Sequence, residues 1–406
     1  MPNENLLRRR TLLAAAAATA VTTAVTSTAP AVARPAAASP AGPPRLTLPA
    51  PTGPHPVGTV SLHLVDSSRT DPWRPSRPTR ELVVQLWYPA RPGDAHPLAP
   101  WMSPGAAALF EQGQGIPPGV LLLPVTHARQ AAPVDRGRCG RSVLLYSPGL
   151  RSDRSVGTAL VEELASHGYL VAAVDHTYDA DQVEFPGGRV ETFALTGEID
   201  DALIAKALAV RTADTRFVLD RLAALDAGHN PDADRQPLPA TLTRAFDLTR
   251  VGVLGHSLGG ATAAAALRVD RRLRAGVNLD GSLLAPVTAG TDRPFLLFGS
   301  DPGSAGEDPS WDAFWTSQRG WKRELALTGS THISFTDLET LLPQAAPVLG
   351  LTPEQVTGAI GTLAPDRAIT AQRDYVRAFF DLHLRQVDGH LLGRPSPRYP
   401  QVRFVR

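Results

Sequence analysis

The stretch from Arg250 to Gly260, R-V-G-V-L-G-H-S-L-G-G, constrains the fold of this chain more than any other. It holds the pattern G-x-S-x-G around Ser257, after an apolar run typical of a strand and before an Ala-rich run typical of a helix. A serine on so sharp a turn needs neighbours without a Cβ atom, and Gly255 and Gly259 meet that need. We therefore predict a nucleophile elbow that holds Ser257 in a strained, exposed conformation.

Segments on both sides of this turn alternate between strand and helix patterns. Apolar runs bounded by Gly, Pro or polar residues predict strands, and apolar residues at helical spacing predict helices. The expected strands are residues 62–65, 81–88, 142–146, 169–175, 275–279, 295–298 and 325–327, and the expected helices are residues 153–167, 200–225 and 368–387. The strand, helix and strand between residues 142 and 175 form a βαβ crossover, which implies parallel strands. We expect a single α/β domain whose central sheet is mostly parallel, with helices on both faces.

The first 33 residues have the features of an export signal. Arginines at positions 8–10 precede a run of Ala, Thr and Val that is too short and too rich in Thr to span a membrane. Residues 31–33, A-V-A, form a small-x-small cleavage site, and the Arg-Arg pair near Leu12-Leu13 fits the twin-arginine type. We expect a secreted protein with a flexible, Pro- and Ala-rich leader over residues 34–54 and a catalytic domain over residues 55–406.

Composition excludes some classes of protein. With 43% hydrophobic and 19% charged residues, the chain can bury a large core. Residues 1–33 carry three Arg and one Glu, so their removal changes the net charge from +1 to −1, and we expect no nucleic-acid partner. Cys139 is the single cysteine, which excludes an internal disulfide, and we interpret it as an inert thiol.

Three strands predicted after the elbow end in turns that carry possible catalytic side chains. A serine hydroxyl needs a base, and the base needs a carboxylate to orient it. The turns hold Asp280, Asp301 and His332, and the carboxyl ends of parallel strands converge on one crevice. Among the 11 histidines, His332 fits the order Ser, acid, His of α/β-hydrolases. We expect His256 to point away from the crevice and support the elbow, and we interpret His167 and His176 as structural.

The strand pattern alone leaves the acid open. Asp280 and Asp301 both end a strand, and many α/β-hydrolases place the acid at the position that Asp301 occupies here. An oxyanion formed by attack on an ester also needs backbone N–H donors. We expect one donor at Leu258, the residue after the nucleophile, and the other at Leu150, in the turn after an earlier strand.

Residues 119–125, G-V-L-L-L-P-V, are unusually apolar for their surroundings, because the segment from residue 89 to 138 is otherwise dominated by Pro, Gly and Ala. Such a run fits either a buried strand or a surface-active patch beside the substrate entrance. We favour the buried strand.

Several separated blocks resemble the platelet-activating-factor acetylhydrolases of the plasma and intracellular type II, with their bacterial relatives. The blocks are residues 51–58, PTGPHPVG, residues 164–176, LASHGYLVAAVDH, residues 255–262, GHSLGGAT, and residues 274–280, RAGVNLD. The similarity runs from about residue 48 to His332, which falls where the family has its histidine. It implies an α/β-hydrolase without metal or cofactor that cleaves short acyl groups from esters, including sn-2 acyl groups of phospholipids.

The resemblance also favours Asp280 over Asp301 as the acid. One departure concerns the second oxyanion donor, because the family's turn usually carries His-Gly where this chain has Ser147-Pro148-Gly149. Contact with a lipid surface stays open, because residues 119–125 align with a lipid-touching segment of relatives but differ from it in sequence.

Three alternatives remain: a triacylglycerol lipase, a cutinase-like polyester hydrolase, and a non-catalytic binding protein on a hydrolase fold. The last would be expected to have lost one of the three catalytic positions, and all three are present. We expect a monomer that acts on a small-molecule or lipid ester.

Overall fold

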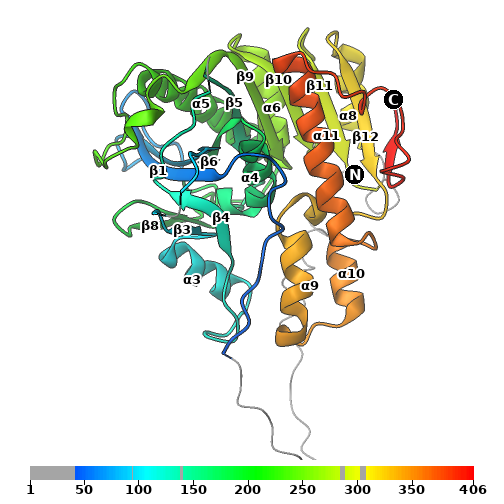
Figure 1. Cartoon of the computed structure of the whole chain (residues 1–406), viewed down its shortest axis with the longest axis horizontal. Helices are drawn as coiled ribbons and strands as arrows, with labels where there is room; N and C mark the ends of the chain where they lie inside the picture. Colours follow the sequence, from blue (N-terminus) through cyan, green and yellow to red (C-terminus); the bar gives the residue numbers. More distant parts are fainter. Residues whose placement is uncertain (1–41, 94, 138–139, 284–288, 302–307) are drawn as a thin grey trace, which may run out of the picture.

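The computed structural model describes residues 42–93, 95–137, 140–283, 289–301 and 308–406. The predicted export signal, the start of the predicted leader and Cys139 lie outside these ranges. Within them, eleven strands form one sheet in the order β13-β12-β11-β10-β9-β5-β6-β2-β1-β4-β3 (Figure 1). The strands are β1 (Val57–Asp66), β2 (Arg80–Pro89), β3 (Leu98–Pro100), β4 (Val125–Gln130), β5 (Arg141–Ser147), β6 (Leu170–Asp175), β9 (Phe246–His256), β10 (Leu273–Leu279), β11 (Phe295–Gly299), β12 (Lys322–Leu327) and β13 (Val402–Phe404). A separate hairpin pairs β7 (Gln182–Glu184) with β8 (Val190–Thr192).

The middle of the sheet is parallel. Strands β12, β11, β10, β9, β5 and β6 pair with one another in parallel, whereas β2 pairs antiparallel with both β6 and β1. The crossover predicted between residues 142 and 175 is the parallel pair β5 and β6 joined through α4 (Thr158–Ser166). The predicted α/β class with a mostly parallel sheet is therefore confirmed.

Helices cover both faces of this sheet. One apolar core joins it to α5 (Asp201–Asp226), α6 (Leu258–Val269) and α8 (Pro309–Ser317). A second core, on the other face, joins it to α4 and to α11 (Pro365–Arg385), which crosses in front of the strands in Figure 1. No helix in the described part of the chain is long and apolar enough to span a bilayer.

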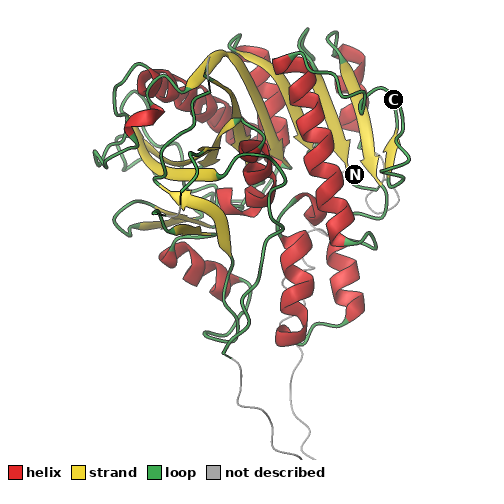
Figure 2. Ribbon diagram, viewed as in Figure 1, coloured by secondary structure: helices red, strands yellow, loops and turns green. Residues whose placement is uncertain are grey.

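A third, smaller group of helices lies below the sheet in Figure 2 and consists of α3 (Pro104–Gly113), α9 (Leu338–Leu349) and α10 (Pro353–Ile360). A third apolar cluster joins α3 and α9 and includes Leu46, Ile116, Leu121 and Leu341. α9 begins just after the short 3-10 turn η4 (His332–Phe335), which follows β12. This group therefore stands beside the turn that carries His332.

The described part of the predicted leader is packed rather than flexible. Leu46 and Leu48 are 5% exposed, and the Thr52 backbone N–H donates to the Glu163 carboxylate at 2.8 Å. Arg373 donates to the backbone carbonyl oxygen of Pro49 at 2.8 Å. The expectation of a flexible leader is wrong from about residue 44 onward, because two leucines and several backbone groups find buried partners. The folded domain therefore begins before the predicted boundary at residue 55.

The strand favoured for residues 119–125 is also wrong. This segment is a loop, and β4 begins only at Val125. Leu121 is 2% exposed, but Leu122 is 37% exposed, so the run is neither wholly buried nor wholly on the surface. Val120 and Leu123 line a cavity instead. The run is apolar because it forms a cavity wall, which needs no regular backbone pairing.

Candidate active site

Ser257 lies at the tip of the sharp turn between β9 and α6, with φ 56° and ψ −124°. A Cβ atom on Gly255 would lie 2.3 Å from the carbonyl carbon of Gly259, and one on Gly259 would lie 1.9 Å from the Ser147 oxygen. Both glycines are thus required by close backbone approach, as the motif predicts. The left-handed φ of Ser257 is the strain expected at an elbow, although its side chain is partly exposed rather than fully so.

The Asp280 carboxylate contacts the His332 ring. The two are joined by a hydrogen bond of 2.6 Å between His332 Nδ1 and Asp280 Oδ2. Asp280 Oδ1 accepts two further hydrogen bonds, from the Ser300 N–H at 2.7 Å and the Ser300 hydroxyl at 2.9 Å. Because an ionised carboxylate can only accept, the proton lies on Nδ1, and Nε2 is left with its lone pair.

Burial works against the charge of Asp280, but its partners outweigh that effect. The hydrogen bond and charge of His332, together with the Ser300 N–H, lower the pKa of the Asp280 carboxyl below its ordinary value. Asp280 also has a positive φ of 54°, which is uncommon for a residue with a side chain. This carboxylate is therefore held ionised in a defined orientation.

Asp301, the competing candidate, has a different contact. Its Oδ2 accepts a hydrogen bond of 2.8 Å from the backbone N–H of Gly329, in the turn that leads to His332. Asp301 thus supports the loop, whereas the carboxylate on the His332 ring is that of Asp280.

We expected His256 to point away from the crevice, and this prediction is wrong. Its ring lies against His332, with ring centroids 4.4 Å apart, and its Nε2 donates to the His332 carbonyl oxygen at 3.0 Å. Burial, with a smaller effect from the charge of His332, lowers the pKa of His256 to about 3. The last residue of β9 reaches His332 because the loop that carries His332 folds over the end of that strand. His256 therefore supports His332 as a neutral ring.

The predicted oxyanion donors flank Ser257. Leu258 is the first residue of α6, and Leu150 follows β5 in the turn that contains Gly149. A Cβ atom on Gly149 would lie 3.2 Å from Ser257 Cβ, so this turn touches the serine. Among the residues that the structure describes, no acceptor takes the backbone N–H of Leu258 or Leu150. The two N–H groups are therefore available to a bound anion.

The two histidines interpreted as structural each contact a buried carboxylate, and His176 Nε2 also lies 2.9 Å from the Ser147 hydroxyl, just before the turn at Gly149. His176 Nδ1 lies 3.0 Å from Asp214, and His167 Nε2 lies 2.8 Å from Glu163.

Ser300, which orients Asp280, was missed by the sequence analysis, although its place at the end of a predicted strand could have indicated it. Within the described ranges, no group of three or more His, Cys, Asp or Glu side chains is placed to bind a metal ion.

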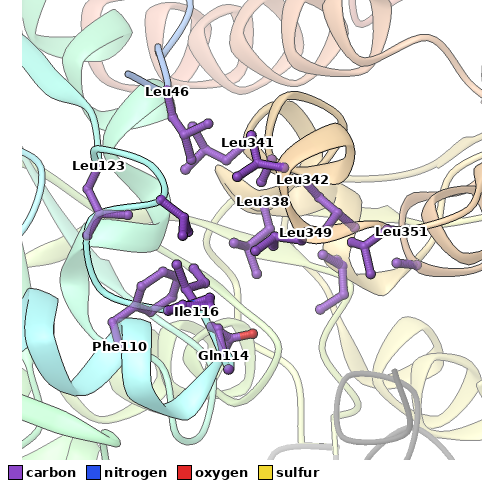
Figure 3. A pocket seen from close by; sticks show the side chains of 17 residues that line it. Leu46, Phe110, Gln114, Ile116, Leu123, Leu338, Leu341, Leu342, Leu349 and Leu351 are labelled. Atoms are coloured by element: carbon purple, nitrogen blue, oxygen red, sulfur yellow. The ribbon is translucent and has the colours of Figure 1, made fainter. Parts of the chain in front are cut away.

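An apolar cavity of about 350 Å³ lies between α3, the loop that follows it, and α9 (Figure 3). Its lining includes Phe110, Ile116, Leu341 and Leu349, and Gln114 is the one side chain of the lining that can form a hydrogen bond. Ile333, the residue after His332, also lines it. The cavity therefore reaches the immediate neighbour of the candidate base, and its volume is that of a small-molecule site.

Comparisons with known proteins give a consistent result. The sequence model of the family described as platelet-activating factor acetylhydrolase, isoform II, matches residues 42–385. A probable 1-alkyl-2-acetylglycerophosphocholine esterase of Arthroderma benhamiae is 28% identical, over 88% of this chain and 93% of its own length. The platelet-activating factor acetylhydrolase of Cavia porcellus is 26% identical, over 72% of this chain and 69% of its own length.

Among solved structures, a ferulic acid esterase from Streptomyces cinnamoneus is similar to this chain. The two share 39% sequence identity with a TM-score of 0.74, over 90% of this chain and all of that one. This similarity confirms the predicted α/β-hydrolase fold. The named relatives are all carboxylic ester hydrolases.

Proposed function

Because the chain belongs to the isoform II family of platelet-activating factor acetylhydrolases and is a carboxylic ester hydrolase, we propose that it cleaves esters through an acyl-enzyme formed on Ser257. The observation that carries this proposal is the hydrogen bond between His332 and Asp280 beside a nucleophile elbow. His332 Nε2 takes the proton of the serine hydroxyl as Ser257 attacks the ester carbonyl. Asp280 fixes the tautomer of His332 and stabilises the imidazolium that forms.

The remaining steps follow from the same groups. The N–H groups of Leu258 and Leu150 stabilise the oxyanion of the tetrahedral intermediate. His332 then gives its proton to the leaving alcohol, and the acyl group stays on Ser257. Water, activated by the same histidine, attacks this acyl-enzyme and releases the carboxylic acid, so that the serine hydroxyl is restored.

For the substrate we propose short-chain carboxylic esters, with sn-2 acyl groups of phospholipids among them. This choice rests on the family, whose relatives are named for an acetylated glycerophosphocholine and for platelet-activating factor. A lipase or a cutinase-like activity is the alternative within the same chemistry.

A second candidate is the hydrolysis of hydroxycinnamate esters such as ferulates. It is favoured by the ferulic acid esterase, whose identity of 39% exceeds the 28% and 26% of the two acetylhydrolase-type relatives. The cavity beside Ile333 also suits an aromatic group, because its walls are apolar and Gln114 can bind a phenolic hydroxyl. An acetyl group would leave this cavity unfilled.

One set of assays separates these substrates. We expect p-nitrophenyl acetate to butyrate to give the highest kcat/KM in a series of rising chain length, and methyl ferulate measures the second candidate. In a Leu341→Trp variant, which fills the cavity, ferulate hydrolysis is expected to fall while acetate hydrolysis, the internal control, is kept. A maximum at long chains with activation by an oil interface would indicate a lipase, and release of soluble monomer from polyester film would indicate a cutinase-like enzyme.

We also propose that the protein is exported by the twin-arginine route and acts as a secreted enzyme. The support for export is the sequence of residues 1–33 alone. Mass spectrometry of culture supernatant is expected to find a mature chain beginning near Arg34. A soluble cytoplasmic protein that keeps Met1 would contradict export.

A further inference from the structure

Arg211 is a fully buried arginine that reaches the turn after β5. It lies on α5, with 0% of its surface exposed, and forms an ion pair with Asp179, itself buried. Its Nη1 donates to the carbonyl oxygen of Pro148 at 2.5 Å, and its Nη2 donates to that of Gly149 at 3.0 Å. The remaining donors go to Asp179 and, at 3.4 Å, to the Ser147 hydroxyl. All five N–H groups of the guanidinium therefore have acceptors.

The bond to Gly149 fixes the direction of the Leu150 N–H. The carbonyl of Gly149 and the N–H of Leu150 belong to one trans peptide, in which the two groups point in opposite directions. Because Arg211 holds the carbonyl, the N–H must point away from Arg211. The other contacts of the turn leave this N–H unused, since the Arg151 N–H donates to the carbonyl oxygen of Asp179 and the Ser152 N–H donates, at 3.2 Å, to the carbonyl oxygen of Gly149, which Arg211 also holds.

The peptide that follows Gly149 gains a second anchor from Arg211, beside the Ser152 N–H. A side chain at Gly149 would press on Ser257, with a Cβ atom only 3.2 Å from that of the serine. A glycine solves the steric problem, but it also allows its peptide more conformations than any other residue. Without Arg211, the Gly149 carbonyl would keep only the longer hydrogen bond of 3.2 Å from the Ser152 N–H, and the peptide between Gly149 and Leu150 could rotate and turn its N–H away from the serine.

We propose that Arg211 is a positioning residue that holds the Leu150 N–H toward the oxyanion formed at Ser257. It touches no substrate and acts through the peptide between Gly149 and Leu150. The role depends on the planar fork of arginine, because a lysine has a single nitrogen and cannot hold two carbonyl groups and a carboxylate in this geometry. This inference rests on the proposed esterase function.

The test is Arg211→Lys in the full mature chain, with p-nitrophenyl acetate as substrate. Loss of one oxyanion donor typically lowers kcat by about 10²- to 10³-fold, so we expect a misdirected donor to lower it by about 10- to 100-fold with little change in KM. A trifluoromethyl ketone, which forms an oxyanion on the serine, should lose affinity by a similar factor. Fluorophosphonate should still label the variant fully, although more slowly, because Ser257 and His332 are untouched.

Arg373→Lys is the matched control. Arg373 is also buried and donates to backbone carbonyl groups, those of Pro49, Ala50 and Ala159, but these lie away from the turn at Gly149. We expect this variant to lose stability without losing kcat. If Arg211→Lys does not fold, the double variant Arg211→Met/Asp179→Leu replaces the ion pair by apolar groups, an exchange that buried pairs often tolerate, and the same loss of kcat is expected.

Two results would overturn the inference. One is a folded Arg211 variant whose kcat and inhibitor affinity match those of the wild type, and the other is an equal loss of kcat in Arg373→Lys. Failure of the proposed function looks different, because the wild-type protein would then neither hydrolyse the ester nor react with fluorophosphonate, and this inference would fall with it.

Discussion

Asp280 receives its orientation from both sides. One carboxylate oxygen accepts from the His332 ring, and the other accepts from the backbone and side chain of Ser300. A carboxylate bound in this way cannot turn to solvent without losing three hydrogen bonds. Asp301 instead stabilises the turn that leads to His332, because its carboxylate accepts a hydrogen bond from the Gly329 N–H.

Because Asp280 contacts the His332 ring and Asp301 contacts a backbone N–H, we expect a large loss of activity in one of two matched variants and a small loss in the other. Asp280→Asn is expected to lower kcat by roughly 10⁴-fold, because the amide can stabilise the wrong tautomer of His332. Asp301→Asn keeps an acceptor oxygen for the Gly329 N–H, so its effect on kcat should be small. Steady-state kinetics on p-nitrophenyl acetate measures both, and a larger loss in Asp301→Asn would contradict the proposed roles.

The candidate residues could be found from sequence because each of them ends a strand or follows a recognisable motif. Sequence pattern alone could not choose between Asp280 and Asp301, since both follow a strand of the same sheet. It also misjudged His256, because the direction of its ring depends on how the loop of His332 folds over β9. Arg211 gave no signal, since an arginine in a long helix usually faces solvent.

Helix α9 carries a buried acid close to the candidate site. Glu339 lies in its first turn with 0% of its surface exposed, and neither carboxylate oxygen has a hydrogen-bond partner among the described residues. Burial raises the pKa of Glu339 to about 8. The side chain is therefore protonated in the folded protein at neutral pH.

From the raised pKa of Glu339 we predict how the stability of the protein varies with pH. The pKa of Glu339 is higher in the folded protein than in the unfolded chain. The free energy of unfolding therefore keeps its full value below about pH 4 and decreases as the pH rises toward 8, where Glu339 must ionise in a buried place. Glu339→Gln keeps the side chain neutral in both states and should remove this loss, which is on the order of a few kcal/mol. Urea unfolding at pH 5 and pH 8 measures it. A variant no more stable than the wild type at pH 8 would contradict the prediction.

The packed segment before residue 55 gives a second prediction for an element. Leu46 and Leu48 are buried, and each fully buried leucine contributes about 1.5–3 kcal/mol. A chain that begins at residue 55 should therefore be several kcal/mol less stable than one that begins at Arg34. Urea unfolding of the two chains tests this, and equal midpoints would show that the segment contributes nothing.

Elements differ in how well their sequences predict them. The central strands and the helices α4, α5 and α11 were predicted within a few residues, because their apolar residues follow the period of the structure. α9 was missed, since it contains Pro343 and Pro347, which normally argue against a helix. The segment before residue 55 was misjudged because its Pro-rich composition hides two leucines that meet a core formed by distant parts of the chain.

Over the whole molecule, the parallel sheet brings distant segments to one edge, where its strands end. β9, β10 and β12 lead to Ser257, Asp280 and His332, and β5 leads to the turn that Arg211 holds. The third apolar cluster adds the wall of a cavity that reaches Ile333, the residue after His332. The sheet therefore positions the candidate catalytic residues, and the smaller group of helices forms the apolar cavity beside Ile333.

The most direct measurement is the reaction of the purified protein with a fluorophosphonate, followed by mass spectrometry of the intact and digested chain. We predict a single adduct, on the peptide that contains Ser257, and complete loss of labelling in Ser257→Ala. The same variant should lose turnover by roughly 10⁴-fold or more, because removal of the nucleophile leaves only the contribution of binding and the oxyanion donors. A correctly folded wild-type protein that fails to label, or a Ser257→Ala variant that keeps most of its activity, would contradict the proposed role of Ser257.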